Sequence, residues 1–194
     1  MTFNILFAGV GGLGAMLTSV IVARAAHYDG YQVNGSQIHG LAQRGGAIPI
    51  EVRFSKEKIY SPMIRDGQAD LIIGFELIEA LRYKNLVNPN RTNFLIDTFS
   101  IKPIGASQYP TITEVKSQIE KIAKKSVFLD AAEISNQKFG NIIYGNIILI
   151  GLAIKENILP LSKEAMIKSL EATLPKDLDK NIQALELGLE TNFQ

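Results

Sequence analysis

Short apolar runs alternate with helical repeats along most of the chain. The run at residues 4–10 is continuous and ends in glycines, which is typical of a central strand in a parallel sheet. Apolar residues then recur at helical spacing up to Tyr28, and residues 31–36 can form a second strand, so a strand–helix–strand unit is predicted. Alternation at residues 48–54 predicts a half-exposed strand, in which Pro49 favours an edge position or a bulge.

The rest of the chain repeats this alternation and then becomes helical. Residues 69–75, 93–97 and 126–130 predict buried strands, and a helix is expected at about 76–84. The C-terminal part has a helical pattern only. Alternating strands and helices with a helical tail predict one α/β domain over residues 1–194, a three-layer α/β/α sandwich with a mostly parallel sheet.

Two helix starts carry capping residues. Thr111 and Glu114 have the spacing of a capping box, which opens a helix that runs to about Lys125. Ser162 follows Pro160 and is expected to be the N-cap of another helix. Near the C-terminus one apolar stripe predicts an amphipathic helix, formed by Leu178, Ile182, Leu185 and Leu189.

Two further polar segments have simple interpretations. The segment 61–67, with Pro62, Asp66 and Gly67, predicts a turn. Glu79 and Arg82 lie three residues apart on the expected helix, and this spacing predicts a surface ion pair.

Composition excludes several classes of function. Hydrophobic residues make up 46% of the chain and charged residues 20%, which is typical of a globular protein. The net charge of +1 argues against binding nucleic acid or an anionic membrane through bulk charge. The absence of cysteine excludes disulfides, thiolate zinc sites and cysteine-ligated iron–sulfur clusters on this chain. Two histidines, His27 and His39, disfavour a buried metal site, so no metal is expected.

The uncharged stretch at residues 2–23 has the hydropathy of a membrane span but not its composition. Four glycines fall within six of its residues, and each lowers helix stability by about 1 kcal/mol relative to alanine. The stretch also lacks the positive start of a secretory signal. We therefore expect a buried strand, a glycine turn and a helix, and a cytoplasmic protein.

The first candidate site is the glycine turn between the first strand and the first helix. Such glycines permit a tight turn, and the helix N-terminus offers N–H groups to an anion. The alternative is that they only let the helix pack closely on the sheet. No carboxylate ends the second strand to hold a ribose, which argues against NAD. The glycines are Gly9, Gly11, Gly12 and Gly14.

The second candidate site is the polar, glycine-rich loop at residues 37–46. Arg44 can pair with a carboxylate or phosphate, Gln43 can orient it, and His39 can exchange a proton near neutral pH. The alternative is a surface turn shaped by its glycines, which are Gly40, Gly45 and Gly46.

These motifs together resemble the gamma domain of 2-oxoacid:ferredoxin oxidoreductases, and the small beta subunit of the indolepyruvate type is the most similar. The resemblance covers the whole chain in unbroken order. One departure is Leu13, where the family usually has a glutamine whose amide offers a polar contact to a ligand. The motifs are Gly9-Val-Gly-Gly-Leu-Gly14, His39-Gly-Leu-Ala-Gln-Arg-Gly-Gly46, Ser61-Pro-Met-Ile64, Glu79-Ala-Leu-Arg82 and Asn181-Ile-Gln-Ala-Leu-Glu-Leu-Gly188.

The resemblance implies a division of labour between two subunits. These enzymes decarboxylate a 2-oxoacid on magnesium thiamine diphosphate, pass electrons through [4Fe–4S] clusters to ferredoxin and form an acyl-CoA. The large subunit is expected to hold the thiamine and the clusters, while the gamma domain binds no cofactor alone and helps to handle CoA. The isolated chain is therefore expected to be inactive. The resemblance makes both glycine motifs candidates for lining the shared cleft, with no proton-transfer role assigned to any of their residues.

Two alternatives stay open at this point. One is a free-standing, Rossmann-like module that binds a nucleotide or CoA; the other is a purely structural subunit. An apolar surface intended for a partner can also produce homodimers when that partner is absent.

Overall fold

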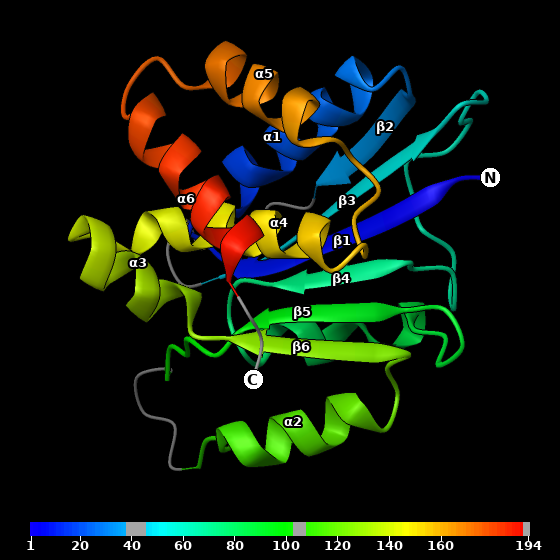
Figure 1. Cartoon of the computed structure of the whole chain (residues 1–194). Coiled ribbons are helices and arrows are strands. Elements are labelled where there is room, and N and C mark those ends of the chain that lie inside the picture. Colours follow the sequence, from blue (N-terminus) through cyan, green and yellow to red (C-terminus); the bar gives the residue numbers. More distant parts are fainter. Residues whose placement is uncertain (38–45, 103–107, 192–194) are drawn as a thin grey trace.

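The computed structural model describes residues 1–37, 46–102 and 108–191. Within them one six-stranded sheet has the order β2-β3-β1-β4-β5-β6 (Figure 1). β1 pairs with β4, β4 with β5 and β5 with β6 in parallel, whereas β3 is antiparallel to both β1 and β2. The sheet is thus mostly parallel, as predicted. The strands are β1 (Phe3–Val10), β2 (Gln32–Gln37), β3 (Ala47–Ser55), β4 (Leu71–Gly74), β5 (Asn93–Asp97) and β6 (Lys125–Leu129).

Helices cover both faces of the sheet, which confirms the sandwich. Ile5 and Phe7 of β1 join the core under α1, α4, α5 and α6, whereas Leu6 and Ala8 join a second core under η1 and α2. Alternation along β1 thus fills both cores. The helices are α1 (Ala15–Tyr28), the 3₁₀ helix η1 (Glu79–Leu86), α2 (Ile112–Glu120), α3 (Ala131–Phe139), the 3₁₀ turn η2 (Ile142–Tyr144), α4 (Gly145–Lys155), α5 (Lys163–Thr173) and α6 (Leu178–Glu190).

The expected position of the third strand was wrong. β3 lies between β2 and β1, so the first two strands run parallel without being neighbours. Pro49 therefore belongs to an inner strand. It pairs with Ala8, while the described pairing with β2 ends at Ile50, and this position near the strand end accommodates the missing N–H.

The helix expected at about 76–84 is instead the 3₁₀ helix η1. Its start is set by the Glu76 carboxylate, which accepts hydrogen bonds from the N–H groups of Ile78 and Glu79. Tyr83 then departs from helical geometry and kinks the element. The two hydrogen bonds to Glu76 therefore cap the start of this element, because the first N–H groups of a helix have no partner within it.

The capping predictions are confirmed, but one helix ends earlier than expected and another was not predicted. Thr111 and Glu114 form a capping box, and α2 ends at Glu120 rather than near Lys125, which enters β6. The helix α3 was not predicted, although Asp130 caps it.

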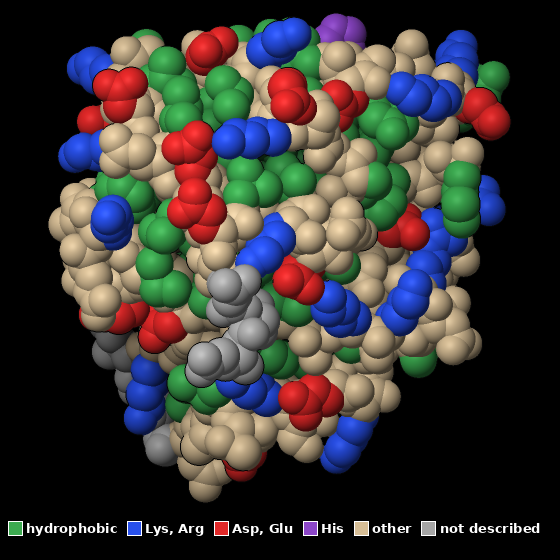
Figure 2. Space-filling view, viewed as in Figure 1, with side chains coloured by type: hydrophobic (Ala, Val, Ile, Leu, Met, Phe, Trp, Pro, Cys, Tyr) green, Lys and Arg blue, Asp and Glu red, His purple; other side chains and the backbone are tan. Residues whose placement is uncertain are grey.

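None of the helices in the described part of the chain has the length and apolar character of a membrane span. Acidic and basic side chains intermingle on the face in Figure 2. That distribution is consistent with the net charge of +1.

Ser162→Ala is expected to lower the free energy of unfolding by about 1–2 kcal/mol. The Ser162 hydroxyl accepts a hydrogen bond from Ala165 N–H and donates one to Asp29, so one substitution removes the cap of α5 and one of two hydrogen bonds to Asp29, while the backbone N–H keeps the other. Urea unfolding measures the loss. The exposed Ser117 serves as the control, because Ser117→Ala in the middle of α2 is expected to change stability by less than about 0.5 kcal/mol.

Candidate functional site

The glycine turn joins the end of β1 to the start of α1. Gly12 has a φ of +101° and Gly14 a φ of +76°, a region that other residues rarely adopt. No side chain among the described residues caps α1, so the N–H groups of its first turn receive no hydrogen bond acceptor from a cap. The turn therefore has the geometry and the dipole that favour an anion.

One hydrogen bond brings the second glycine motif to this turn. Gly11 N–H donates to the Gly46 carbonyl oxygen at 2.9 Å. Gly46 is the one member of that motif within the described residues; the other five lie outside them, namely His39, Gly40, Gln43, Arg44 and Gly45. The structure thus joins the two motifs at their borders.

The turn lies at the carboxyl edge of the sheet, where the parallel strands β1, β4 and β5 end. A cavity of about 50 Å³ there is bordered by Gly12, by Phe75 after β4 and by Asp97 at the end of β5. A second hollow of about 290 Å³ adjoins it and is lined by Gly12, Gly14 and residues from α1, α4 and α6. Open α/β sheets bind ligands at this edge.

Asn146, in the first turn of α4, holds the glycine turn in place. It is 7% exposed and donates from Nδ2 to the Leu13 carbonyl oxygen. Leu13, which stands where the family usually has glutamine, is therefore held through its backbone. The start of α4 supports the turn in this way.

Asp97 is a titratable group at this edge that sequence reasoning did not single out. Its carboxylate is 3% exposed and accepts hydrogen bonds from Phe99 N–H at 3.0 Å and Ala132 N–H at 3.1 Å. Burial raises the pKa of Asp97 to about 7, and the nearby Asp130 adds to the rise. The signal that could have identified it is an acidic residue at the end of a buried strand.

The ion pair predicted between Glu79 and Arg82 is present, but it is not a surface pair at both ends. Arg82 Nε lies 2.9 Å from Glu79 Oε1, and the two side chains are 60% and 8% exposed. Burial raises the pKa of Glu79, and its Oε2 is a buried oxygen with no hydrogen-bond partner among the residues that the structure describes. Arg82 thus shields a buried carboxylate beside the buried Glu76.

The described residues contain no group of three or more His, Asp or Glu side chains placed to hold a metal ion. At the carboxyl edge, the features suited to a ligand are the uncapped start of α1, the two hollows and the buried Asp97. This arrangement can bind an anion.

Comparison with known proteins identifies relatives along nearly the whole chain. The model of the family "Pyruvate ferredoxin/flavodoxin oxidoreductase" matches residues 4–191. Indolepyruvate oxidoreductase subunit IorB of Archaeoglobus fulgidus is 34% identical, with 97% of this chain and 94% of the relative covered. The 2-oxoglutarate synthase subunit KorC of Methanothermobacter marburgensis is 26% identical, with 98% and 96% covered.

Solved structures share the fold. The keto/oxoacid ferredoxin oxidoreductase gamma subunit of Geobacter sulfurreducens has a TM-score of 0.68 and 26% identity, with 97% of this chain and 96% of that chain covered. The 2-oxoglutarate:ferredoxin oxidoreductase of Magnetococcus marinus, solved with coenzyme A bound, has a TM-score of 0.73 and 19% identity. The match covers 97% of this chain and 30% of that longer one.

The family match and the relatives agree with the order of the sequence motifs. The chain is homologous to small subunits of 2-oxoacid:ferredoxin oxidoreductases, which favours a subunit over a free-standing nucleotide-binding module. It belongs to the pyruvate ferredoxin/flavodoxin oxidoreductase family.

Proposed function

We propose that this chain is the small subunit of an oxidoreductase that decarboxylates an indolepyruvate-type or other arylpyruvate 2-oxoacid, with CoA as co-substrate and ferredoxin as electron acceptor. The observation that carries the proposal is the 34% identity with the IorB subunit over nearly the full length of both chains. The KorC relatives are less similar, at 26–27% identity, and this difference favours the indolepyruvate type over 2-oxoglutarate.

The proposal places every redox centre on a partner. Protein-bound iron–sulfur clusters are held mainly by cysteine thiolates, and this chain has no cysteine. The large subunit therefore supplies the [4Fe–4S] clusters and magnesium thiamine diphosphate, and this chain supplies part of the cleft in which CoA meets the acyl group. The complex is expected to work in the cytoplasm.

The glycine turn is the proposed contact for CoA phosphates. The start of α1 carries no side-chain cap among the described residues, and its N–H groups favour a negative charge. The Gly11–Gly46 hydrogen bond supports a common cleft for both motifs, because it holds the end of the second motif against the turn. The candidates are Gly9, Gly11, Gly12, Gly14, His39, Gly40, Gln43, Arg44, Gly45 and Gly46.

Co-expression with the thiamine-binding large subunit tests the proposed assembly. A stable heteromeric complex that reduces ferredoxin with indolepyruvate and CoA is expected, whereas either chain alone should be inactive. A large subunit that is fully active alone and forms no complex would contradict the proposal. Size-exclusion chromatography of the isolated small subunit shows separately whether it forms a homodimer.

Arg44→Ala in the assembled complex is expected to raise KM for CoA by about tenfold without loss of assembly, because a guanidinium paired with a phosphate contributes about 1.5–3 kcal/mol. Steady-state kinetics with varied CoA measure the effect. Lys168→Ala removes an exposed cation on α5 and is the matched control. Unchanged KM values for both CoA and the oxoacid would instead favour a purely structural subunit.

A further inference from the structure

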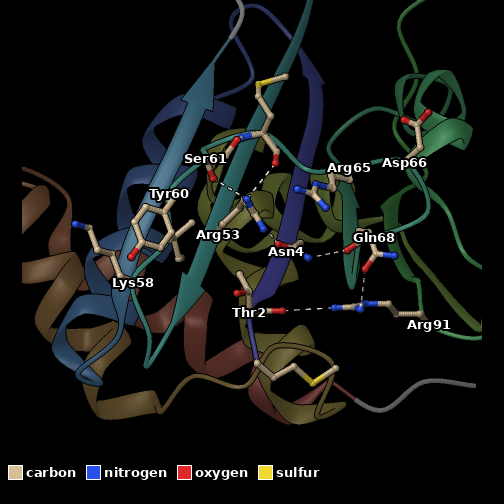
Figure 3. Close-up of a pocket in the computed structure, with 13 residues that line it drawn as sticks. Thr2, Asn4, Arg53, Lys58, Tyr60, Ser61, Arg65, Asp66, Gln68 and Arg91 are labelled. Carbon is tan, nitrogen blue, oxygen red and sulfur yellow. Dashed lines mark hydrogen bonds between the residues drawn. The ribbon is translucent and has the colours of Figure 1, made fainter.

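A third hollow, the amino-edge pocket, lies where the parallel strands begin. It has a volume of about 690 Å³ and is lined by residues from the start of β1, from the end of β3, from the segment between β3 and β4 and from the segment before β5 (Figure 3). Asn4 lies in this pocket and Gly11 follows the opposite end of β1, so about 23 Å separates the pocket from the glycine turn. The amino-edge pocket is therefore distinct from the hollows beside the glycine turn.

Arg53 forms the fixed floor of this pocket. Its Nε donates to Asn4 Oδ1 at 2.8 Å, and its Nη1 donates to the carbonyl oxygens of Ser61 at 2.6 Å and Met63 at 3.1 Å. All three acceptors are neutral, so none of them cancels the charge. The Nη2 group, with its pair of N–H donors, has no partner among the described residues.

Further cations line the pocket near Arg53, whose charge is offset only in part by Glu51 on the same strand. Figure 3 shows Lys58 and Tyr60 on one side of the pocket, Arg91 on the other, and Arg53 and Arg65 between them. Arg65 and Lys58 are exposed, and neither forms an ion pair within the described part of the chain.

The acidic groups nearby do not balance these cations. Asp70 neutralises Arg91, with Nε and Oδ1 2.6 Å apart. Among the described lining residues Asp66 is the one carboxylate, and it accepts a hydrogen bond from Asn85. The pocket therefore carries an excess of positive charge in a chain whose net charge is only +1.

A small anion of high charge matches this arrangement. A guanidinium held in one orientation by neutral acceptors offers the two N–H donors of Nη2 at little entropic cost, which suits the oxygens of a phosphate. The volume exceeds that of one phosphate ion and lies in the range of small-molecule sites. Tyr60 is 85% exposed at the rim, with Lys58 Nζ 5.1 Å from the centroid of its ring, and the rest of the ring can contact such a ligand.

We propose that the amino-edge pocket binds a phosphate-class anion with two or more negative charges, held by Arg53 Nη2, Arg65 and Lys58. This site does not depend on the proposed function, because it is separate from the glycine turn and requires no partner chain.

Titration calorimetry of the isolated chain with tripolyphosphate tests the site. The variant is Lys58→Ala with Arg65→Ala, because Arg53 and Arg91 also hold neighbouring segments together. Its affinity is expected to fall by about tenfold or more, and wild-type binding should weaken as salt is added. Circular dichroism confirms that the variant is folded.

The control removes two exposed cations elsewhere, Lys138→Ala with Lys168→Ala, and should leave the affinity unchanged. An equal loss in the control, or no saturable binding, overturns the proposal. Unchanged affinity in the pocket variant also overturns it, because tripolyphosphate would then bind elsewhere, such as the glycine turn. Citrate, a polycarboxylate of somewhat lower charge, should bind more weakly; an affinity equal to that of tripolyphosphate would overturn the phosphate assignment.

Discussion

Gly188→Val is expected to lower the free energy of unfolding by about 3 kcal/mol or more. Gly188 faces α4, and a Cβ there would lie 2.9 Å from Ile148 C and Leu152 N, and closer still to the Ile148 carbonyl oxygen. These atoms belong to the backbone of a buried helix, so they cannot turn aside as a flexible side chain would. The two helices must separate, and the hydrophobic core that contains the buried residues of α4 and α6 loses contacts.

Chemical unfolding with a matched control measures this effect. Gln183 lies on the exposed side of α6, and Gln183→Ala should change stability by less than about 0.5 kcal/mol. Gly151 is the facing residue, and a Cβ on it would lie 3.0 Å from the Cα of Gly188. The two glycine substitutions should therefore be less than additive, because helices already separated by one tolerate the other. A Gly188→Val protein as stable as the control would show that the helices do not touch here.

The contact between α4 and α6 gives the sequence motif at residues 181–188 a role in packing. It also links this motif to the glycine turn. Ala184 and Gly188 bring α6 against α4, and α4 begins at Gly145 beside Asn146, which holds the glycine turn through Leu13. Loss of the contact between α4 and α6 is therefore expected to loosen the turn as well as the core.

Local patterns were sufficient for the strands and caps but not for the strand order. The run at 93–97 became β5 with the same bounds, because burial on both faces leaves a continuous apolar signal. The insertion of β3 between β1 and β2 depends on pairings such as Phe3 with Phe54 and Gln32 with Ser55, which join distant segments. Hydrophobic alternation predicts that a segment is a strand, but it does not predict which strand it pairs with.

The candidate site was predictable in its motifs and not in its surroundings. Positive φ angles at Gly12 and Gly14 follow from glycines between a strand and a helix. Segment 61–67 was interpreted as a simple turn, because its role depends on Arg53, which binds Ser61 and Met63 from another strand. Hydrogen bonds of that kind arise only from the tertiary structure.

Asp97→Asn is expected to change how stability depends on pH, by about 3 kcal/mol between about pH 5 and about pH 8. Burial raises the pKa of Asp97 from 3.8 to about 7, so the folded state holds this proton more tightly than the unfolded state does. As pH rises from about 4 to about 7, the unfolded chain releases the proton first and the folded state loses stability relative to it. Above about 7 the loss is complete.

Asparagine cannot ionise, so the variant escapes this loss. At about pH 5 the variant should be slightly less stable than the wild type, by about 1–2 kcal/mol. The amide oxygen of asparagine can accept a hydrogen bond from one of the N–H groups of Phe99 and Ala132, whereas its NH2 group, itself a donor, faces the other. At about pH 8 the difference should reverse, so that the variant is the more stable protein. Urea unfolding at both pH values measures it, and subtraction removes the contribution of all other groups.

Glu171→Gln is the matched control, because Glu171 is an exposed carboxylate on α5 and its substitution should give the same difference from wild type at both pH values. A pH-independent difference for Asp97→Asn would mean that Asp97 ionises in its usual range and that the carboxyl edge is wetter than its burial indicates. A shift of the expected sign would establish a raised pKa beside Gly12, so that below about pH 7 an anion entering this edge meets mostly a neutral acid and not a second negative charge.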